Sequence, residues 1–380
     1  MLKRSDYIDA IESAFLVNPV CALLGPRQCG KTTLSKQYSA QMEMRVHFFD
    51  LEDPTHLSKL ANPKFALQNL DGLIVIDEVQ RVPELFQYLR VFVDEKPGRQ
   101  ILILGSASSE LIKQSSETLA GRISYIEMNP FSLKEVGDIN KLWQRGGFPK
   151  SFLAQSDKVS NEWRKNYIRT FLEKDIRNLG FDISAQTMRR FWYMLAHYHG
   201  QIFNASEIGR SIDASHKTTD RYLDILTGTF MIRRLSPWFE NISKRQVKSP
   251  KIFFRDSGLL HTILGIDNLS ALRMNPKLGP SWEGFALEEV VRVLKVDVED
   301  CYFWASQSGA ELDLLVLKDS KKLAFEIKYT DSPKITKSMR VAMEDLSLDS
   351  LTIIIPGRDK FRLDEKIDVC GLEEYISLTF

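Results

Sequence analysis

The sequence predicts an α/β protein built from three successive modules, and three observations lead to this prediction. Residues 19–39 read as a buried strand, a glycine-containing loop and a helix. Residues 188–265 have the pattern of three short helices and a hairpin, and residues 281–330 that of a helix and three strands. We therefore expect a parallel-sheet domain over 1–143, a helical lid and helix–hairpin module over 144–270, and a second α/β domain over 271–380.

Composition excludes several classes of protein. The chain has 380 residues, enough for two or three domains, and 51 Lys and Arg balance 50 Asp and Glu. This balance excludes a polybasic protein or a disordered acidic one. No apolar run approaches the 18 residues of a membrane-spanning helix, and the N-terminus lacks the apolar stretch of a signal peptide. The four cysteines form no CxxC pair, so we expect neither a zinc ribbon nor a disulfide framework. Reduced cysteines are typical of the cytosol, so we expect a cytoplasmic protein.

The first module contains a nucleotide-binding pattern. Residues 25–33 read GPRQCGKTT, which is G-x-x-x-x-G-K-[ST] placed between a strand and a helix. Gly25 and Gly30 let the backbone wrap a polyphosphate, while Lys31 reaches the β- and γ-phosphates and the Thr32 hydroxyl holds Mg²⁺. The predicted ATP-binding segment is Gly25, Pro26, Arg27, Gln28, Cys29, Gly30, Lys31, Thr32 and Thr33.

Two further strands supply polar groups to the same site. The apolar run at 73–77 ends in Asp77 and Glu78, as expected of a buried parallel strand that presents acids at its tip. We predict that Asp77 holds Mg²⁺ and that Glu78 polarises the attacking water. The run at 100–105 ends at Ser106, which we predict to sense the γ-phosphate.

Arg122 follows a Leu-Ala-Gly turn and is a candidate catalytic residue. An arginine presented in this way can stabilise charge on the transferring phosphoryl group, either in its own chain or in a neighbouring subunit. The alternative is a solvated arginine in a loop.

Taken together, GPRQCGKTT, IDEVQRVPEL, LGSAS and ETLAGR resemble the motifs of a group of bacterial and archaeal AAA-type ATP-binding proteins. The resemblance continues through a Gly-Gly-Phe-Pro turn at 146–149 and the helix around YIRTFLEKDI into the C-terminal module. It implies an AAA-type P-loop NTPase domain, ATP and Mg²⁺ as cofactors, and a homo-oligomer as a candidate assembly.

Residues 188–265 predict a winged helix. Helices are expected at 188–199, 205–212 and 216–229, the last one capped by Ser215. The inward positions on the last helix are Tyr222, Leu223, Ile225 and Leu226, and the exposed N-terminal ones are His216, Lys217, Thr219 and Asp220. The start of a recognition helix contacts base edges, so Lys217 is a predicted DNA contact.

The hairpin that follows is basic. Seven Lys and Arg and a single acid lie between Arg233 and Arg255, a charge pattern typical of phosphate binding. Lys244, Arg245 and Lys248 are therefore further predicted DNA contacts. The alternative is a winged helix used for packing or oligomerisation.

The third module places acids and a lysine on neighbouring strands. Alternate residues of a strand share a face, so Glu326 and Lys328 point the same way, as do Glu311 and Asp313. Two carboxylates can bind Mg²⁺ while a lysine positions a water for attack on a phosphodiester. Asp313 and Glu326 are expected on adjacent antiparallel strands.

Asp313 followed by Glu326-Ile327-Lys328 resembles the PD-(D/E)xK restriction-endonuclease-like fold. The resemblance implies a nuclease-like domain in which Glu283 or Glu289 of the preceding helix supplies an additional acid. The alternative is an inactive nuclease fold retained for binding, with Lys328 in an ion pair.

The sequence thus predicts a Mg²⁺-dependent AAA-type ATPase coupled to a winged helix and a nuclease-like domain, which acts on or binds DNA and has no membrane span. Two alternatives come from other classes. One is a nucleotide-switched protein-interaction scaffold, and the other is a DNA-binding regulator with an inactive nuclease fold.

Overall fold

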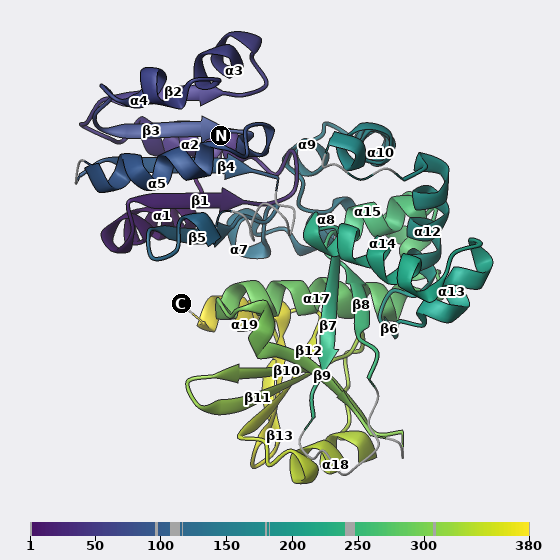
Figure 1. The fold of residues 1–380 in the computed structure, drawn as a ribbon. Helices are drawn as coiled ribbons and strands as arrows, with labels where there is room; N and C mark the ends of the chain where they lie inside the picture. The colour runs from purple at the N-terminus through teal and green to yellow at the C-terminus, as the bar shows by residue number, and fades with distance from the viewer. Residues whose placement is uncertain are drawn as a thin grey trace. The chain divides into compact units, whose positions relative to one another are not determined.

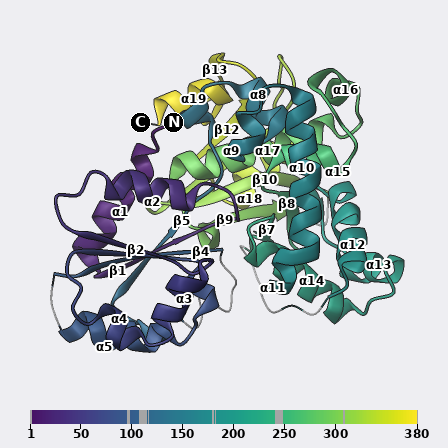
Figure 2. The ribbon, with the colours of Figure 1, turned by 90° about the horizontal axis from the view of Figure 1, so that it is seen from above.

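The computed structural model describes residues 2–95, 98–106, 115, 117–178, 181, 183–239, 248–306 and 309–379. The chain forms two compact units (Figures 1 and 2). One comprises Met1–Pro130 with Gly228–Phe230, and the other comprises Phe131–Thr227 with Met231–Phe380.

The first unit is built on a parallel sheet of five strands in the order β2-β3-β4-β1-β5. The strands at 19–24, 73–77 and 100–105 predicted from the sequence are confirmed. The bounds are β1 (Val20–Leu24), β2 (Val46–Asp50), β3 (Leu73–Asp77), β4 (Gln100–Gly105) and β5 (Ile123–Glu127).

Helices cover both faces of this sheet, which explains why its inner strands are apolar without alternation. On one face α1 (Ser5–Val17) and α2 (Lys31–Ser39) pack on side chains such as Leu23 and Val75. On the other face α5 (Leu85–Glu95) packs on Ile74 and its neighbours (Figure 2). The short helices α3 (Pro54–Leu60) and α4 (Pro63–Leu67) complete that second layer.

The second unit contains a sheet of nine strands in the order β13-β14-β12-β11-β10-β9-β7-β8-β6. The hairpin of β7 and β8 is antiparallel, and β7 also pairs in parallel with β9, so the two later modules predicted from the sequence share one sheet. The bounds are β6 (Gln201–Ile202), β7 (Ile232–Pro237), β8 (Lys251–Phe254), β9 (Cys301–Ala305), β10 (Glu311–Lys318), β11 (Lys321–Ile327), β12 (Ser350–Ile355), β13 (Lys360–Asp364) and β14 (Ile367–Gly371).

The long helix α17 (Leu278–Leu294) joins the helical part of this unit to the sheet (Figure 1). It contacts α15 (Ser257–Ile263) as well as β11 and α19 (Leu372–Leu378). Because it packs on several sides, acidic side chains such as Glu288 are buried with its apolar ones. The remaining helices of the part of this unit that is described are α7 (Leu133–Val136), α8 (Ile139–Arg145), α9 (Pro149–Phe152), α10 (Asp157–Thr170), α11 (Ile176–Asn178), α12 (Ala185–His197), α13 (Ala205–Ser211), α14 (His216–Gly228), α16 (Leu269–Arg273) and α18 (Lys337–Asp345).

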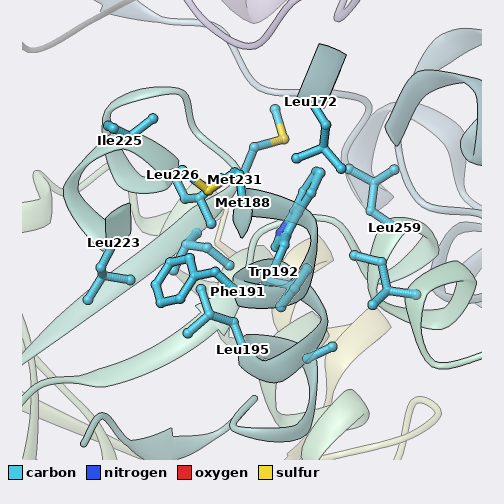
Figure 3. Close-up of a cluster of buried hydrophobic side chains, with 14 of the residues drawn as sticks. Leu172, Met188, Phe191, Trp192, Leu195, Leu223, Ile225, Leu226, Met231 and Leu259 are labelled. Carbon is cyan, nitrogen blue, oxygen red and sulfur yellow. The ribbon is translucent and has the colours of Figure 1, made fainter. Parts of the chain in front are cut away.

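The helical part has its own apolar core around α12 (Figure 3). Trp192 is fully buried and lies among Leu172, Leu259 and Met231, which come from three other segments. A π-helical turn, Phe171–Asp175, extends α10 and contributes Leu172 to this core. The three predicted helices and the hairpin that follows them are thus present as α12, α13, α14 and β7–β8.

One detail of the predicted third helix is wrong. Thr219 was expected at the exposed end of the helix, but it is buried and its hydroxyl donates a hydrogen bond to the Ser215 carbonyl at 2.9 Å. The close contact between this turn and Gly209 of the preceding helix covers it. His216 and Lys217 are exposed as predicted.

Candidate functional site

The glycine loop after β1 has the backbone geometry of a phosphate-binding loop. A Cβ atom on Gly25 would lie 2.1 Å from the Met128 carbonyl oxygen, so only glycine fits there. Gly30 has a φ of 106°, a value that favours glycine, and is the N-cap residue of α2. The free amides at the start of a helix can bind a phosphate group. The Lys31 ammonium donates hydrogen bonds to the carbonyls of Gly25 at 2.9 Å and Pro26 at 3.0 Å. The loop therefore carries its positive charge at its centre.

Thr32 and Asp77 meet across the sheet edge. The Thr32 hydroxyl donates a hydrogen bond of 2.6 Å to Asp77 Oδ2, which places a hydroxyl and a carboxylate oxygen side by side. Mg²⁺ takes such oxygen ligands together with waters and substrate phosphates, so this pair fits the predicted magnesium site. Burial raises the pKa of Asp77, against the lowering effect of the Thr32 hydrogen bond and of Lys31.

Glu78 has a strained backbone and a hydrogen-bond partner, Gln80, that the sequence motifs do not identify. Its φ is 58°, which is unusual for a residue other than glycine, and such strain clusters at functional sites. Gln80 Nε2 donates hydrogen bonds both to a Glu78 carboxylate oxygen and, at 3.1 Å, to the Ser106 hydroxyl. Burial raises the pKa of Glu78. Gln80 thereby links the predicted water-polarising acid to the predicted phosphate sensor.

The other loop residues have different surroundings. Arg27 forms an ion pair of 2.6 Å with Glu52, and Cys29 is fully buried, so its thiol does not face the solvent. Gln28 and Thr33 are exposed, and Pro26 is buried.

Arg122 lies at the opposite end of the strands from this loop. It immediately precedes β5, and its carbonyl accepts a hydrogen bond from Val20 at the start of β1. Five strand residues, about 16 Å at about 3.3 Å each, separate it from the loop that follows Leu24. Its guanidinium is paired with Asp94. A role within its own chain is therefore incompatible with the structure, and only the role in a neighbouring subunit stays a prediction.

In the second unit, β10 and β11 are antiparallel as predicted and bring three of the nuclease-like residues together. Asp313 Oδ2 accepts a hydrogen bond of 2.8 Å from the Ile327 amide, and Lys328 forms an ion pair of 2.7 Å with Glu326. Glu283 of α17 belongs to the same cluster, and burial together with Asp313 raises its pKa to about 8. Burial and Asp313 likewise raise the pKa of Glu326 to about 7.

Glu289 lies apart from this cluster. Its carboxylate accepts a hydrogen bond from the Leu133 amide at 2.7 Å and pairs with Arg292 at 2.9 Å. The two candidate acids of the helix are six residues apart and therefore face different sides of it. Of the two, only Glu283 is positioned with Asp313.

The basic hairpin is largely neutralised by carboxylates. Arg233 and Arg255 are both paired with buried Glu288, and Arg234 with Asp224 at 2.7 Å. Lys251 is buried among the acids of the cluster just described. The expectation that this whole run is an exposed basic patch is therefore wrong, because three of its seven basic side chains, those of Arg233, Lys251 and Arg255, are at most 8% exposed. Lys248 is exposed, whereas the predicted DNA contacts Lys244 and Arg245 lie outside the described residues.

Three family models match successive parts of the chain. Residues 17–137 match an AAA domain, residues 136–270 a domain of unknown function (DUF8612), and residues 278–375 a domain of unknown function (DUF4143). The AAA match includes the glycine loop, Asp77, Glu78 and Ser106. The first module is therefore an AAA-type P-loop domain.

A relative covers nearly the whole chain. Protein Rv2008c of Mycobacterium tuberculosis is 48% identical over 371 residues, which are 97% of this chain and 83% of that protein. The chain belongs to the same family as this mycobacterial protein. Protein MJ1544 of Methanocaldococcus jannaschii is 21% identical over 402 residues, with 94% of this chain and 87% of that protein covered.

Among solved structures, the Walker-type ATPase PABY2304 of Pyrococcus abyssi is similar to this chain, with a TM-score of 0.49 and 16% identity. The match covers 70% of this chain and 96% of that one. No helix within the described ranges is both long and apolar enough to cross a bilayer.

Proposed function

We propose that this protein is a Mg²⁺-dependent ATPase that hydrolyses ATP at the loop between β1 and α2. The observation that carries this proposal is the convergence of Lys31, Thr32, Asp77 and Glu78 at one edge of the parallel sheet. Lys31 offsets charge on the β- and γ-phosphates, and Thr32 with Asp77 holds the magnesium ion. When bound, that ion neutralises charge that develops on the phosphate oxygens.

Glu78 acts as the general base in this proposal. Its half-buried carboxylate has a raised pKa, which brings it closer to the value at which a base accepts a proton efficiently near neutral pH. Gln80 fixes one of its oxygens and leaves the other able to face a water. Ser106, on the same hydrogen-bonded chain, is the group that senses the γ-phosphate.

The test compares two lysines of one helix. Phosphate release and binding of a fluorescent ATP analogue are measured with Mg²⁺ for the wild type, Lys31→Ala and Lys36→Ala. Lys36 is exposed in the same helix, so its loss should leave both readouts unchanged. We expect Lys31→Ala to lose hydrolysis and most of the binding. Hydrolysis by Lys31→Ala at the wild-type rate would overturn the proposal.

We propose DNA as the partner of the helical module. The supporting observation is a pair of exposed cations, Lys217 and Arg221, which lie one turn apart on the same face of α14. Exposed Lys248 lies on the segment between β7 and β8, which follows that helix. These exposed cations can contact DNA phosphates, even though most basic side chains of the hairpin that are described are paired with carboxylates.

DNA binding is tested by anisotropy of labelled single-stranded, duplex and branched DNA at several salt concentrations. The double variant Lys217→Glu/Arg221→Glu should bind more weakly and show a shallower salt dependence, because fewer counterions are released. Lys165→Glu, an exposed charge of α10, is the matched control. Equal affinity of the double variant and the wild type would reject this interface. ATP-dependent oligomerisation without DNA-stimulated hydrolysis would instead favour the protein-interaction scaffold.

A further inference from the structure

Lys251 occupies the centre of the acidic cluster in the second unit. Its ammonium nitrogen lies 3.3 Å from Glu283 Oε1 and 3.8 Å from Asp313 Oδ1, and it is also paired with Glu311. The side chain is 4% exposed. The cation thus contacts carboxylates from both α17 and β10.

The strand that carries Lys251 explains its position. Lys251 is the first residue of β8, which pairs with β7, and β7 pairs in turn with β9. Its ammonium lies 5.9 Å from the ring centroid of Phe303 on β9. The lysine is therefore held by the continuous sheet, and its charge is directed toward the acids of the neighbouring module.

The cluster as folded does not fit a divalent ion. A metal site of the predicted nuclease type needs the oxygens of Asp313, Glu326 and Glu283 around one ion. In the described part of the chain, no group of three or more His, Cys, Asp and Glu side chains is arranged to hold a metal. Two of these acids instead face Lys251, and Glu326 pairs with Lys328.

We propose that Lys251 is the resident cation of this cluster and takes the place that a divalent metal would need. A buried ammonium surrounded by carboxylates resists displacement, because leaving either partner alone in the interior is strongly unfavourable. A metal ion could enter only after Lys251 has left. The C-terminal domain therefore binds no Mg²⁺ at Asp313 and cleaves no phosphodiester with it. This inference is independent of the ATPase proposal, since it concerns a different unit of the chain.

The test measures Mn²⁺ binding by calorimetry in full-length protein. The first site is disabled in every sample by Thr32→Ala and Asp77→Asn, so that only other metal sites contribute. In this background we expect no Mn²⁺ binding. Binding of one Mn²⁺ ion per chain that disappears when Asp313→Asn is added would overturn the proposal. This arm needs no change at Lys251 and stands even if variants at that position fail to fold.

The second arm replaces Lys251 by Met, which keeps the length of the side chain and removes its charge. We expect the Lys251→Met protein to gain one Mn²⁺ site per chain and a melting temperature that rises with Mn²⁺. Both gains should be lost when Asp313→Asn is added. Lys248→Met, an exposed lysine of the same segment, should gain neither. A folded Lys251→Met protein that binds no Mn²⁺ would contradict the proposed exchange of lysine for metal.

Discussion

At the scale of single residues, the nucleotide site depends on one hydrogen-bonded chain that the sequence motifs do not describe. The motifs identify Glu78 and Ser106 separately, whereas the structure connects them through Gln80. Gln80 lies in a one-turn 3-10 helix, Val79–Arg81, that follows β3. The strained backbone of Glu78 and this partner together fix where its carboxylate points.

Replacement of Gln80 by Ala should lower kcat for ATP hydrolysis while leaving ATP affinity nearly unchanged. A hydrogen bond to a charged group contributes roughly 1.5–3 kcal/mol, so the loss should be on the order of tenfold or more. Steady-state kinetics and analogue binding on the same preparation separate the two quantities. Gln87→Ala in α5 serves as a control. A Gln80→Ala enzyme with unchanged kcat would remove its positioning role.

Arg122→Ala should affect hydrolysis only where chains associate. Because Arg122 lies at the end of its own strands opposite the glycine loop, we predict that it acts on a phosphate bound by a neighbouring subunit. We expect the turnover per chain of the variant to equal that of the wild type at dilute protein and to fall below it as concentration rises. Turnover measured across a dilution series, with light scattering on the same samples, checks this. A deficit that is the same at every concentration would contradict it.

At the scale of elements, α12 forms the centre of the helical module. Trp192 lies in the core of this module (Figure 3) and is fully buried. Its neighbour Tyr193 is 44% exposed. Trp192→Ala should lower the free energy of unfolding by about 3–5 kcal/mol, because a large cavity is left. Tyr193→Ala should cost less than about 1 kcal/mol. Denaturant unfolding of both variants tests this, and equal losses would mean that the core is assigned incorrectly.

The contact of α17 with the hairpin is electrostatic. Burial acts to raise the pKa of Glu288, but Arg233 and Arg255 lower it to about 2. A lowered pKa in the folded state means that the ion pair stabilises the protein above pH 4.5, the ordinary value, and that this stabilisation is lost as the pH falls toward 2.

Glu288→Gln should therefore cost about 3–5 kcal/mol at pH 7, because two guanidinium groups lose their buried partner. The difference from the wild type should shrink between about pH 4.5 and pH 2. Urea unfolding at several pH values measures it, with exposed Glu299→Gln as control. A cost that does not change with pH would rule out the ion pair as its cause.

At the scale of the whole molecule, local sequence patterns predicted the strands and helices well. They did not predict which charged side chains pair with one another. The glycine loop, the acidic strand tip and the antiparallel pair of β10 and β11 depend on short stretches of sequence, and all were predicted. The charges of the hairpin depend on contacts that no local pattern contains. Arg233 meets Glu288, 55 residues away, and Lys251 meets Asp313 in another predicted module.

The continuous nine-stranded sheet explains this failure. A charge count along the chain treats every lysine and arginine as exposed, but strand pairing between β7 and β9 turns several of them toward α17 and β10. All four residues of β8, which read KIFF, are buried. A lysine at the start of this short apolar run was the local signal that Lys251 could face inward.

In the proposed ATPase, Glu78 is the base for ATP hydrolysis at the P-loop of the AAA domain. The most direct measurement is single-turnover hydrolysis of ATP by Glu78→Gln with Mg²⁺, alongside the wild type. We expect the variant to bind ATP as tightly as the wild type and to hydrolyse it about 10²–10⁴-fold more slowly. Hydrolysis by Glu78→Gln at the wild-type rate would contradict the account.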